Sequence, residues 1–267
     1  MSEFLPESLP ISLTTDFGTS DWFVGVMKGV MVGINPKAHL IDITHHISPG
    51  NIRGAAFILM QSILWFPSKT VHMAVIDPGV GTLRNGLIIE TNSCFLVGPD
   101  NGIFSWAILN LDLRQVFRLN PSKFDGEISH TFHGRDLFAP AAAKLSLGVN
   151  PNQLGEKIDS MVSLEWPKHE ISETGIFGQI IHEDRFGNLI TNIPHSSVPA
   201  SIKNLDLKVR IPNGVISIRI HPTYGHAPDG QPALIEASTG FLEFAIKNGS
   251  AAKFLDWSAG HKFELIF

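Results

Sequence analysis

Three side chains of different chemical type, Asp77, Arg84 and His133, offer chemistry that can activate a water molecule. Asp77 directly follows a run of β-forming residues, and a glycine-rich loop separates it from Arg84. A carboxylate at the end of a buried strand faces the crevice where α/β proteins bind ligands, and glycines leave loop amides free to bind. If the three groups meet, they can orient and deprotonate water. A strand–turn–strand with a structural ion pair accounts for the same residues equally well.

The first half of the chain alternates predicted strands with predicted helices. Strands are expected at residues 11–15, 39–43 and 71–76, with helices at residues 22–34 and 51–66 between them. This alternation predicts an α/β domain with a mostly parallel sheet flanked by helices. A hairpin is expected around Asn92, and His133 is placed at the junction of a loop and an alanine-rich helix, where side chains face a pocket.

The pattern changes beyond residue 148, where prolines and asparagines replace the helical periodicity. We assign residues 1–160 to the N-terminal α/β domain, 161–172 to a linker and 173–267 to a C-terminal domain. In the last segment, short apolar runs alternate with Gly and Pro turns. This predicts a smaller antiparallel β domain that resembles a barrel or a sandwich.

The bulk composition narrows the function classes. Hydrophobic residues make up 43% of the chain, charged residues 17%, and the net charge is −5. No basic stripe is present, which argues against nucleic-acid binding, and no apolar run is long enough to span a membrane. Residues 1–10 lack the features of a signal peptide, so a cytoplasmic location is expected. The single cysteine, Cys94, lies in an apolar run and is expected to be a buried thiol.

Asp16 is a second strand-end carboxylate. It occupies the position where doubly wound proteins bind ribose hydroxyls, although a turn that caps the following helix explains it as well. No GxGxxG motif follows, which argues against a standard dinucleotide site. The histidines His45, His46 and His133 lack metal-ligand spacing, so neither a metal nor a cofactor is expected.

The C-terminal half offers binding groups in turns. Asp184 and Asn188 can hold a zwitterionic amino-acid group, or they can simply form a tight turn. Tyr224, the only tyrosine, can stack on a base or pack in a core. The turns at residues 238–240 and 248–250 expose amides and hydroxyls, but singly they are ordinary turns.

Together these segments resemble one family, the S-adenosyl-L-methionine hydroxide adenosyltransferases, which are related to SAM-dependent fluorinases and chlorinases. The resemblance covers nearly the whole chain. It rests on Thr14-Thr15-Asp16-Phe17-Gly18, Asp77-Pro78-Gly79-Val80-Gly81-Thr82 with Arg84, Gly98-Pro99-Asp100-Asn101-Gly102, Thr131-Phe132-His133-Gly134-Arg135-Asp136-Leu137-Phe138-Ala139-Pro140, and Phe186-Gly187-Asn188-Leu189 with Thr191-Asn192.

The resemblance implies hydrolysis of S-adenosyl-L-methionine to adenosine and methionine, without a cofactor, by a homotrimer whose active sites lie at subunit interfaces. It implies that Asp16 binds the ribose diol and that Asp77, Arg84 and His133 form a water-orienting triad. The methionine end is then held by Asp184, Asn188 and Ser238. The adenine is held by Tyr224 and by the backbone from Asn248 to Ala251, including Ser250.

Departures from the halogenating relatives favour water as the nucleophile. Those enzymes carry a tyrosine and a threonine where this chain has Asp77 and Val80, and a serine where it has Gly134. An aspartate repels a halide, whereas it accepts a hydrogen bond from water. The alternatives are a SAM-dependent halogenase and a non-catalytic sensor of S-adenosylmethionine or adenosine; a metal-dependent phosphohydrolase is more distant.

Overall fold

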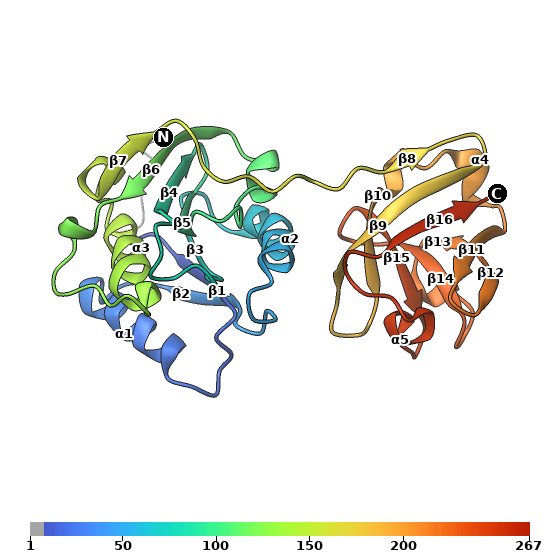
Figure 1. Ribbon diagram of the computed structural model, residues 1–267, viewed down its shortest axis with the longest axis horizontal. Coiled ribbons are helices and arrows are strands. Elements are labelled where there is room, and N and C mark those ends of the chain that lie inside the picture. The colour runs from blue at the N-terminus through green and yellow to red at the C-terminus, as the bar shows by residue number, and fades with distance from the viewer. Residues whose placement is uncertain (1–7) are drawn as a thin grey trace. The chain divides into compact units, whose positions relative to one another are not determined.

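The computed structural model describes residues 8–267, and the chain divides into two compact units (Figure 1). Unit 1 ends at Glu165 and unit 2 begins at Trp166, inside the stretch predicted as the linker. The segment 1–10, compared above with a signal peptide, lies mostly outside the described residues.

The sheet of unit 1 is mixed, so the prediction of a mostly parallel sheet is wrong. Its strands run in the order β2-β1-β3-β5-β4-β6-β7. The pairs β1–β2, β1–β3 and β3–β5 are parallel, whereas β4–β5, β4–β6 and β6–β7 are antiparallel. The strands are β1 (Ile11–Thr15), β2 (Leu40–Thr44), β3 (Val71–Val75), β4 (Gly86–Thr91), β5 (Phe95–Pro99), β6 (Leu113–Leu119) and β7 (Gly155–Ile158).

Connection lengths explain the mixture of strand directions. Parallel neighbours need a long crossover, and the helices α1 (Phe23–Ile34) and α2 (Ile52–Ser62) lie in the connections that supply it. By contrast, the short turn 92–94 joins β4 to β5 and permits only an antiparallel hairpin. The predicted hairpin around Asn92 is therefore confirmed, and this hairpin is one of the features that make the sheet mixed.

Helices cover both faces of this sheet (Figure 1). On one face, α1 packs against α3 (Ala139–Ser146), and Met27 and Met31 of α1 join Met73 of β3 in one core. On the other face, α2 shares a second core with Ala74 and Ile76. Because successive side chains of a strand point to opposite faces, β3 contributes to both cores, and Asp77 follows its buried end.

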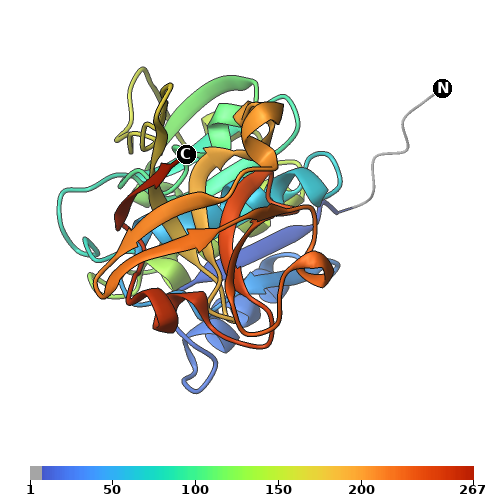
Figure 2. The same cartoon turned by 90° about the vertical axis from the view of Figure 1, so that its right-hand side faces the viewer.

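Unit 2 is a nearly closed, barrel-like sheet in which all neighbours are antiparallel except β13–β14. Figure 2 shows its curved strands, golden yellow to red, and their inward side chains form one core. β12 contacts β14, which brings the two ends of the strand order together. The elements are β8 (Glu170–Ile171), β9 (Gly175–Glu183), β10 (Leu189–Pro194), α4 (Ala200–Lys203), β11 (Leu207–Ile211), β12 (Gly214–Ile218), β13 (Ile220–His221), β14 (Pro232–Glu236), β15 (Phe241–Ile246), α5 (Ala251–Leu255) and β16 (Lys262–Ile266).

Among the helices within residues 8–267, the longest is α1 with 12 residues, and none of them combines the length and the apolar character needed to cross a membrane.

Candidate active site

The structure brings Asp77, Arg84 and His133 into one hydrogen-bonded cluster. Arg84 Nε donates to Asp77 Oδ1 at 2.9 Å, and Arg84 Nη2 donates to the second carboxylate oxygen and to His133 Nδ1, the latter at 2.7 Å. The side chains of Arg84 and Asp77 are only 10% and 5% exposed, and the guanidinium lies 5.2 Å from the ring centre of Phe138. Such a bidentate contact fixes both the orientation of the guanidinium relative to the carboxylate and the distance between the two groups.

Three neighbouring segments hold this cluster. Asp77 comes shortly after β3, Arg84 just before β4, and His133 at the start of the π-helical turn Gly134–Phe138 that leads into α3. The loop between Asp77 and Arg84 depends on Gly81, whose φ is +77° and where a Cβ atom would lie 2.4 Å from the carbonyl oxygen of His130. Only glycine allows this approach without strain, so the loop is held close to the segment that carries His133.

The hydrogen bonds define the protonation of His133. A guanidinium is only a donor, so Nδ1 of His133 accepts from Arg84 and the proton of the neutral ring is on Nε2. Burial lowers the pKa of His133, and the positive charge of Arg84 lowers it further. At neutral pH the cluster therefore contains one carboxylate, one guanidinium and one neutral imidazole.

Asp16 follows the C-terminal end of a strand, as Asp77 does. In the parallel pair β1–β3, Thr15 is in register with Val75, so the segments that carry Asp16 and Asp77 leave adjacent strands in the same direction. Asp16 Oδ2 accepts from the amide of Gly50 at 2.8 Å, and it is not the N-cap of α1. The rings of Phe17 and Phe132, next in sequence to Asp16 and His133, pack edge to face at 6.1 Å.

In unit 2, the turn between β9 and β10 fixes the carboxylate of Asp184. Its Oδ1 atom accepts from the amides of Phe186 and Asn188 at 2.8 and 2.9 Å, and its Oδ2 atom accepts from Asn188 Nδ2 at 2.9 Å. The structure therefore contains the tight turn that the sequence allowed. This turn leaves the orientation of Asp184 well defined.

The segment from Asn248 to Ala251 packs against this turn. Gly187 has a φ of +81°, and a Cβ atom there would lie 2.1 Å from Ser250 Oγ. Ser250 also caps α5 by accepting from the amide of Lys253 at 3.2 Å, and Ala251, the first residue of α5, is buried. Asn248 turns the chain through a left-handed conformation (φ 62°).

Tyr224 contacts a residue that the sequence reasoning missed. Its hydroxyl donates to the carboxylate of Glu243 on β15, which is 3% exposed. Burial raises the pKa of both groups, and the nearby negative charge of Asp184 raises both further. The sequence feature that could have revealed Glu243 is the presence of an acidic residue inside the apolar run 241–246. Ser238 is exposed in the β14–β15 turn, and no hydrogen bond joins it to Asp184 or Asn188 within residues 8–267.

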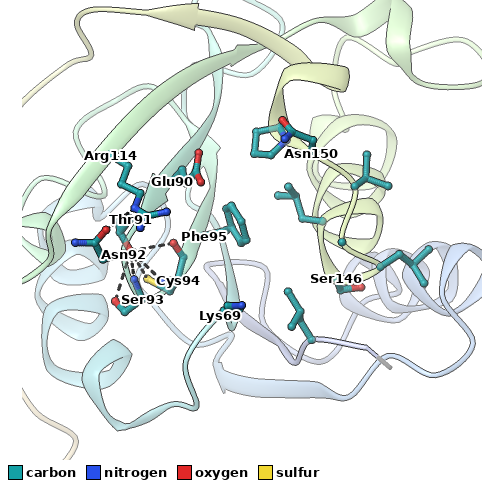
Figure 3. Close-up of a pocket in the computed structure, with 16 residues that line it drawn as sticks. Lys69, Glu90, Thr91, Asn92, Ser93, Cys94, Phe95, Arg114, Ser146 and Asn150 are labelled. Carbon is teal, nitrogen blue, oxygen red and sulfur yellow. Dashed lines mark hydrogen bonds between the residues drawn. The ribbon is translucent and has the colours of Figure 1, made fainter. Parts of the chain in front are cut away.

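Two cavities in unit 1 differ in their relation to the cluster. Arg84 and His133 line one of about 360 Å³. A larger one of about 450 Å³ lies at the opposite end of the sheet, near the start of β5, and includes none of the predicted site residues (Figure 3). The thiol of Cys94 lines the larger cavity, but burial raises its pKa, which makes it a poor nucleophile.

The fold and the cluster define a class: a two-domain protein with a carboxylate–guanidinium–imidazole site at the strand ends of a mixed α/β unit, followed by a barrel-like β unit. Among residues 8–267 no group of three His, Cys, Asp or Glu side chains is placed to hold a metal ion. Comparison with known families refines this class. The SAM hydroxide adenosyltransferase N-terminal domain matches residues 11–155, and the C-terminal domain of the same family matches residues 178–264. The chain belongs to this family.

Individual relatives agree with the family. An (R)-S-adenosyl-L-methionine hydrolase from Methanocaldococcus jannaschii is 37% identical, over 96% of this chain and 95% of the relative. One from Thermus thermophilus is 34% identical over 96% and 99%. A fluorinase from Actinoplanes is 24% identical over 88% and 90%. The crystal structure of an uncharacterized conserved protein from Thermotoga maritima, 32% identical, superposes with a TM-score of 0.89 over 96% of this chain and all of the other.

Proposed function

We propose that this protein hydrolyses S-adenosyl-L-methionine to adenosine and L-methionine by in-line attack of water at the ribose C5′ atom. The observation that carries the proposal is the hydrogen-bonded cluster of Asp77, Arg84 and His133. The names of the relatives from Methanocaldococcus jannaschii and Thermus thermophilus support the same reaction.

The chemistry requires activation of the nucleophile rather than of the leaving group. The sulfonium leaves as a neutral thioether, so its departure needs no general acid. Water is a poor nucleophile, and the positive charge of Arg84 lowers the pKa of a water bound beside it. The one acceptor nitrogen of the neutral His133 ring, Nδ1, is already occupied by the hydrogen bond from Arg84. The oxygens of Asp77 also accept from Arg84, but each carboxylate oxygen has a second lone pair. Asp77 is therefore the group of the three that accepts the water's proton.

The remaining predicted residues bind the substrate in this proposal. Asp16 holds the ribose diol, and its place at the sheet edge beside Asp77 supports this role. The methionine end is held by Asp184, Asn188 and Ser238, with the fixed carboxylate of Asp184 facing the ammonium group. Tyr224 and the segment with Asn248, Ser250 and Ala251 hold the adenine. No cofactor takes part.

We further propose a homotrimer in which residues 1–160 of one subunit and residues 173–267 of its neighbour complete each active site, with residues 161–172 as the linker. The family resemblance supports this arrangement. A cytoplasmic location stays a prediction from the sequence.

Product analysis tests the proposed reaction. Purified protein is incubated with S-adenosyl-L-methionine in chloride buffer, and the nucleosides are identified by mass spectrometry. Equimolar adenosine and methionine are expected. A chlorinated nucleoside would instead indicate a halogenase, and substrate that stays bound and intact would indicate a sensor. Either outcome would overturn the proposal.

A further inference from the structure

The turn 98–102 carries one of the family motifs, yet it takes no part in the reaction proposed above. It follows from β5 and lies against β3. The close approach is built into the backbone, because a Cβ atom at Gly98 would lie 2.2 Å from the carbonyl oxygen of Ala74 on β3. Only glycine lets two backbones come so near to each other. The turn is therefore held beside the strand that leads to Asp77.

Asn101 bonds to the backbone next to Asp77. The register of β3 with β1 ends at Val75, and its register with β5 ends earlier, at Met73. Ile76 therefore lies beyond both ladders. Its carbonyl oxygen accepts a hydrogen bond from Asn101 Nδ2 at 2.8 Å. The side-chain amide thus takes the place of a strand partner for the residue that directly precedes Asp77.

The orientation of this amide is fixed at both ends. Asn101 Oδ1 accepts from the backbone amide of Ile103 at 3.2 Å, so Nδ2 is the end that faces Ile76. The contact with Ile103 serves the turn itself, whereas the contact with Ile76 reaches a segment 25 positions away in the sequence. An ionised carboxylate at position 101 can make the first contact but has no donor for the second. The two contacts can therefore be separated by substitution.

Asp100, the preceding residue, holds the other side of the cluster. Its amide donates to the carbonyl oxygen of Asn85 at 2.9 Å, and its Oδ2 atom accepts from Asn85 Nδ2 at 3.3 Å. Asn85 directly follows Arg84. The Oδ1 atom of Asp100 accepts from the amide of Val162 at 2.7 Å, which ties the turn to the last segment of unit 1. Two successive residues of one turn thus fix the backbone before Asp77 and after Arg84.

We propose that the turn 98–102 is a positioning element for water activation, in which Asn101 fixes the location of Asp77 and Asp100 fixes that of Arg84. Neither residue of the turn touches the substrate. Together they hold the carboxylate and the guanidinium at the separation of their bidentate contact before the substrate binds. The inference rests on the proposed function, in which these two groups act on the attacking water. It adds that kcat depends on a side-chain amide outside the cluster, since a misplacement of about 1 Å can cost about 10²-fold in rate.

Substitutions of Asn101 separate positioning from the folding of the turn. Asn101→Asp keeps the acceptor within the turn and removes the donor to Ile76, whereas Asn101→Ala removes both. Each variant is expected to lower kcat by about 10- to 100-fold, while KM for S-adenosyl-L-methionine stays within about threefold. Asn150→Ala is the matched control, because this asparagine caps a 3₁₀ turn of unit 1 by the same kind of contact, at 2.9 Å. Its kcat is expected to stay within about twofold of the wild type.

A double-mutant cycle excludes a general loss of stability. In the Asp77→Asn background, Asn101→Ala is expected to lower kcat by no more than about twofold further, because the group that Asn101 positions is already inactive. A loss of folded protein alone would instead reduce the activity by the same factor in both backgrounds.

The contact between Arg84 and Asp77 can also be observed without turnover. The Nε–H group of Arg84 donates to Asp77 at 2.9 Å, and its NMR signal is assigned by its loss in Arg84→Lys. Its hydrogen exchange with solvent is expected to be about tenfold faster in Asn101→Ala than in the wild type, as for the loss of one hydrogen bond. The exchange is expected to be unchanged in Asn150→Ala.

The outcomes separate this inference from the proposed function. Wild-type kcat in Asn101→Asp, an equal loss in both backgrounds of the cycle, or unchanged exchange of the Arg84 Nε–H group in Asn101→Ala would each overturn the positioning role, even in an active hydrolase. If the exchange changes as expected but the wild type does not turn over S-adenosyl-L-methionine, the positioning of the cluster holds and the proposed reaction fails.

Discussion

At the scale of single residues, Arg84 determines how its two partners can act. Its guanidinium donates to both oxygens of Asp77 and to Nδ1 of His133. Because it has no acceptor atom, it favours an ionised Asp77 and a neutral His133. The cluster is thus preorganised for one protonation state before any substrate binds.

Asp77→Asn tests the need for a charge at the proton acceptor. The amide keeps the size of the side chain but cannot take a proton, so kcat is expected to fall by about 10²–10⁴. Affinity for S-adenosyl-L-methionine, measured by calorimetry with the product concentration kept low, is expected to change by less than about threefold. The exposed Asp125→Asn serves as the control. Near-normal turnover in Asp77→Asn would exclude Asp77 as the acceptor.

His133 predicts a pH dependence. Its pKa is lowered from the ordinary 6.5 by burial and by Arg84, so the ring stays neutral until the pH falls below the usual histidine range. Protonation then places two donors against each other and breaks the contact with Arg84. Activity is therefore expected to be flat through neutral pH and to decrease only on the acid side of 6.5.

Histidine NMR measures this titration directly. The ¹³Cε1 resonance of His133, assigned with a His133→Asn variant, is expected to titrate with a midpoint below 6.5. A midpoint at or above 6.5 would contradict the assigned tautomer and the role of Arg84.

At the residue scale, the sequence predicted positions where the place along a strand carried the information. Asp16 and Asp77 were singled out because they follow buried strands, and the structure has them after the same ends of the adjacent parallel strands β1 and β3. Their roles in binding and catalysis stay predictions. Glu243 was missed because one acid in an apolar strand usually faces solvent on a half-buried sheet. Its hydrogen-bond partner, Tyr224, is nineteen positions away in the sequence. A pattern of neighbouring residues therefore could not predict this contact.

At the scale of elements, local patterns predicted strands well and strand partners poorly. The predicted strand 11–15 coincides with β1, and the predicted strand 71–76 differs from β3 by one residue, since runs of β-forming residues and flanking turns are local signals. The prediction for the unit 1 sheet was wrong because β6 and β7 pair antiparallel through contacts between distant segments. The strand β7 itself lies in a stretch whose prolines and asparagines resembled a linker.

The central strand β3 carries a buried histidine that makes stability depend on pH. His72 is 0% exposed, its Nδ1 atom lies 2.6 Å from Ser12 Oγ, and burial lowers its pKa from 6.5 to about 4. The unfolded chain therefore binds a proton that the folded chain does not. The stabilisation is complete above pH 6.5 and decreases as the pH falls from 6.5 towards 4.

Urea unfolding measures this effect. Between pH 8 and pH 5, His72 is expected to account for a loss of about 2 kcal/mol in the free energy of unfolding. The loss is expected to disappear in His72→Leu and to persist in the exposed control His39→Leu. An identical pH profile in the wild type and His72→Leu would show that this histidine is not the cause.

At the scale of the whole molecule, complementation tests the proposed trimer. Asp77→Asn disables unit 1 and Asp184→Asn weakens unit 2, so each variant alone is expected to have little activity. The two variants are then co-expressed at equal levels. If each site combines unit 1 of one subunit with unit 2 of its neighbour, about a quarter of the sites receive two intact units, and activity is expected to recover to that extent. No recovery in mixed assemblies, isolated by two affinity tags, would place each site within one subunit.

The most direct test of the account is the origin of the new oxygen atom. S-adenosyl-L-methionine is hydrolysed in H₂¹⁸O, and both products are examined by mass spectrometry with fragmentation of the ribose. Attack of water at C5′ predicts one ¹⁸O atom at the 5′ oxygen of adenosine and none in methionine. Unlabelled adenosine, or label in the amino-acid product, would show that water attacks elsewhere and would contradict the role assigned to Asp77, Arg84 and His133.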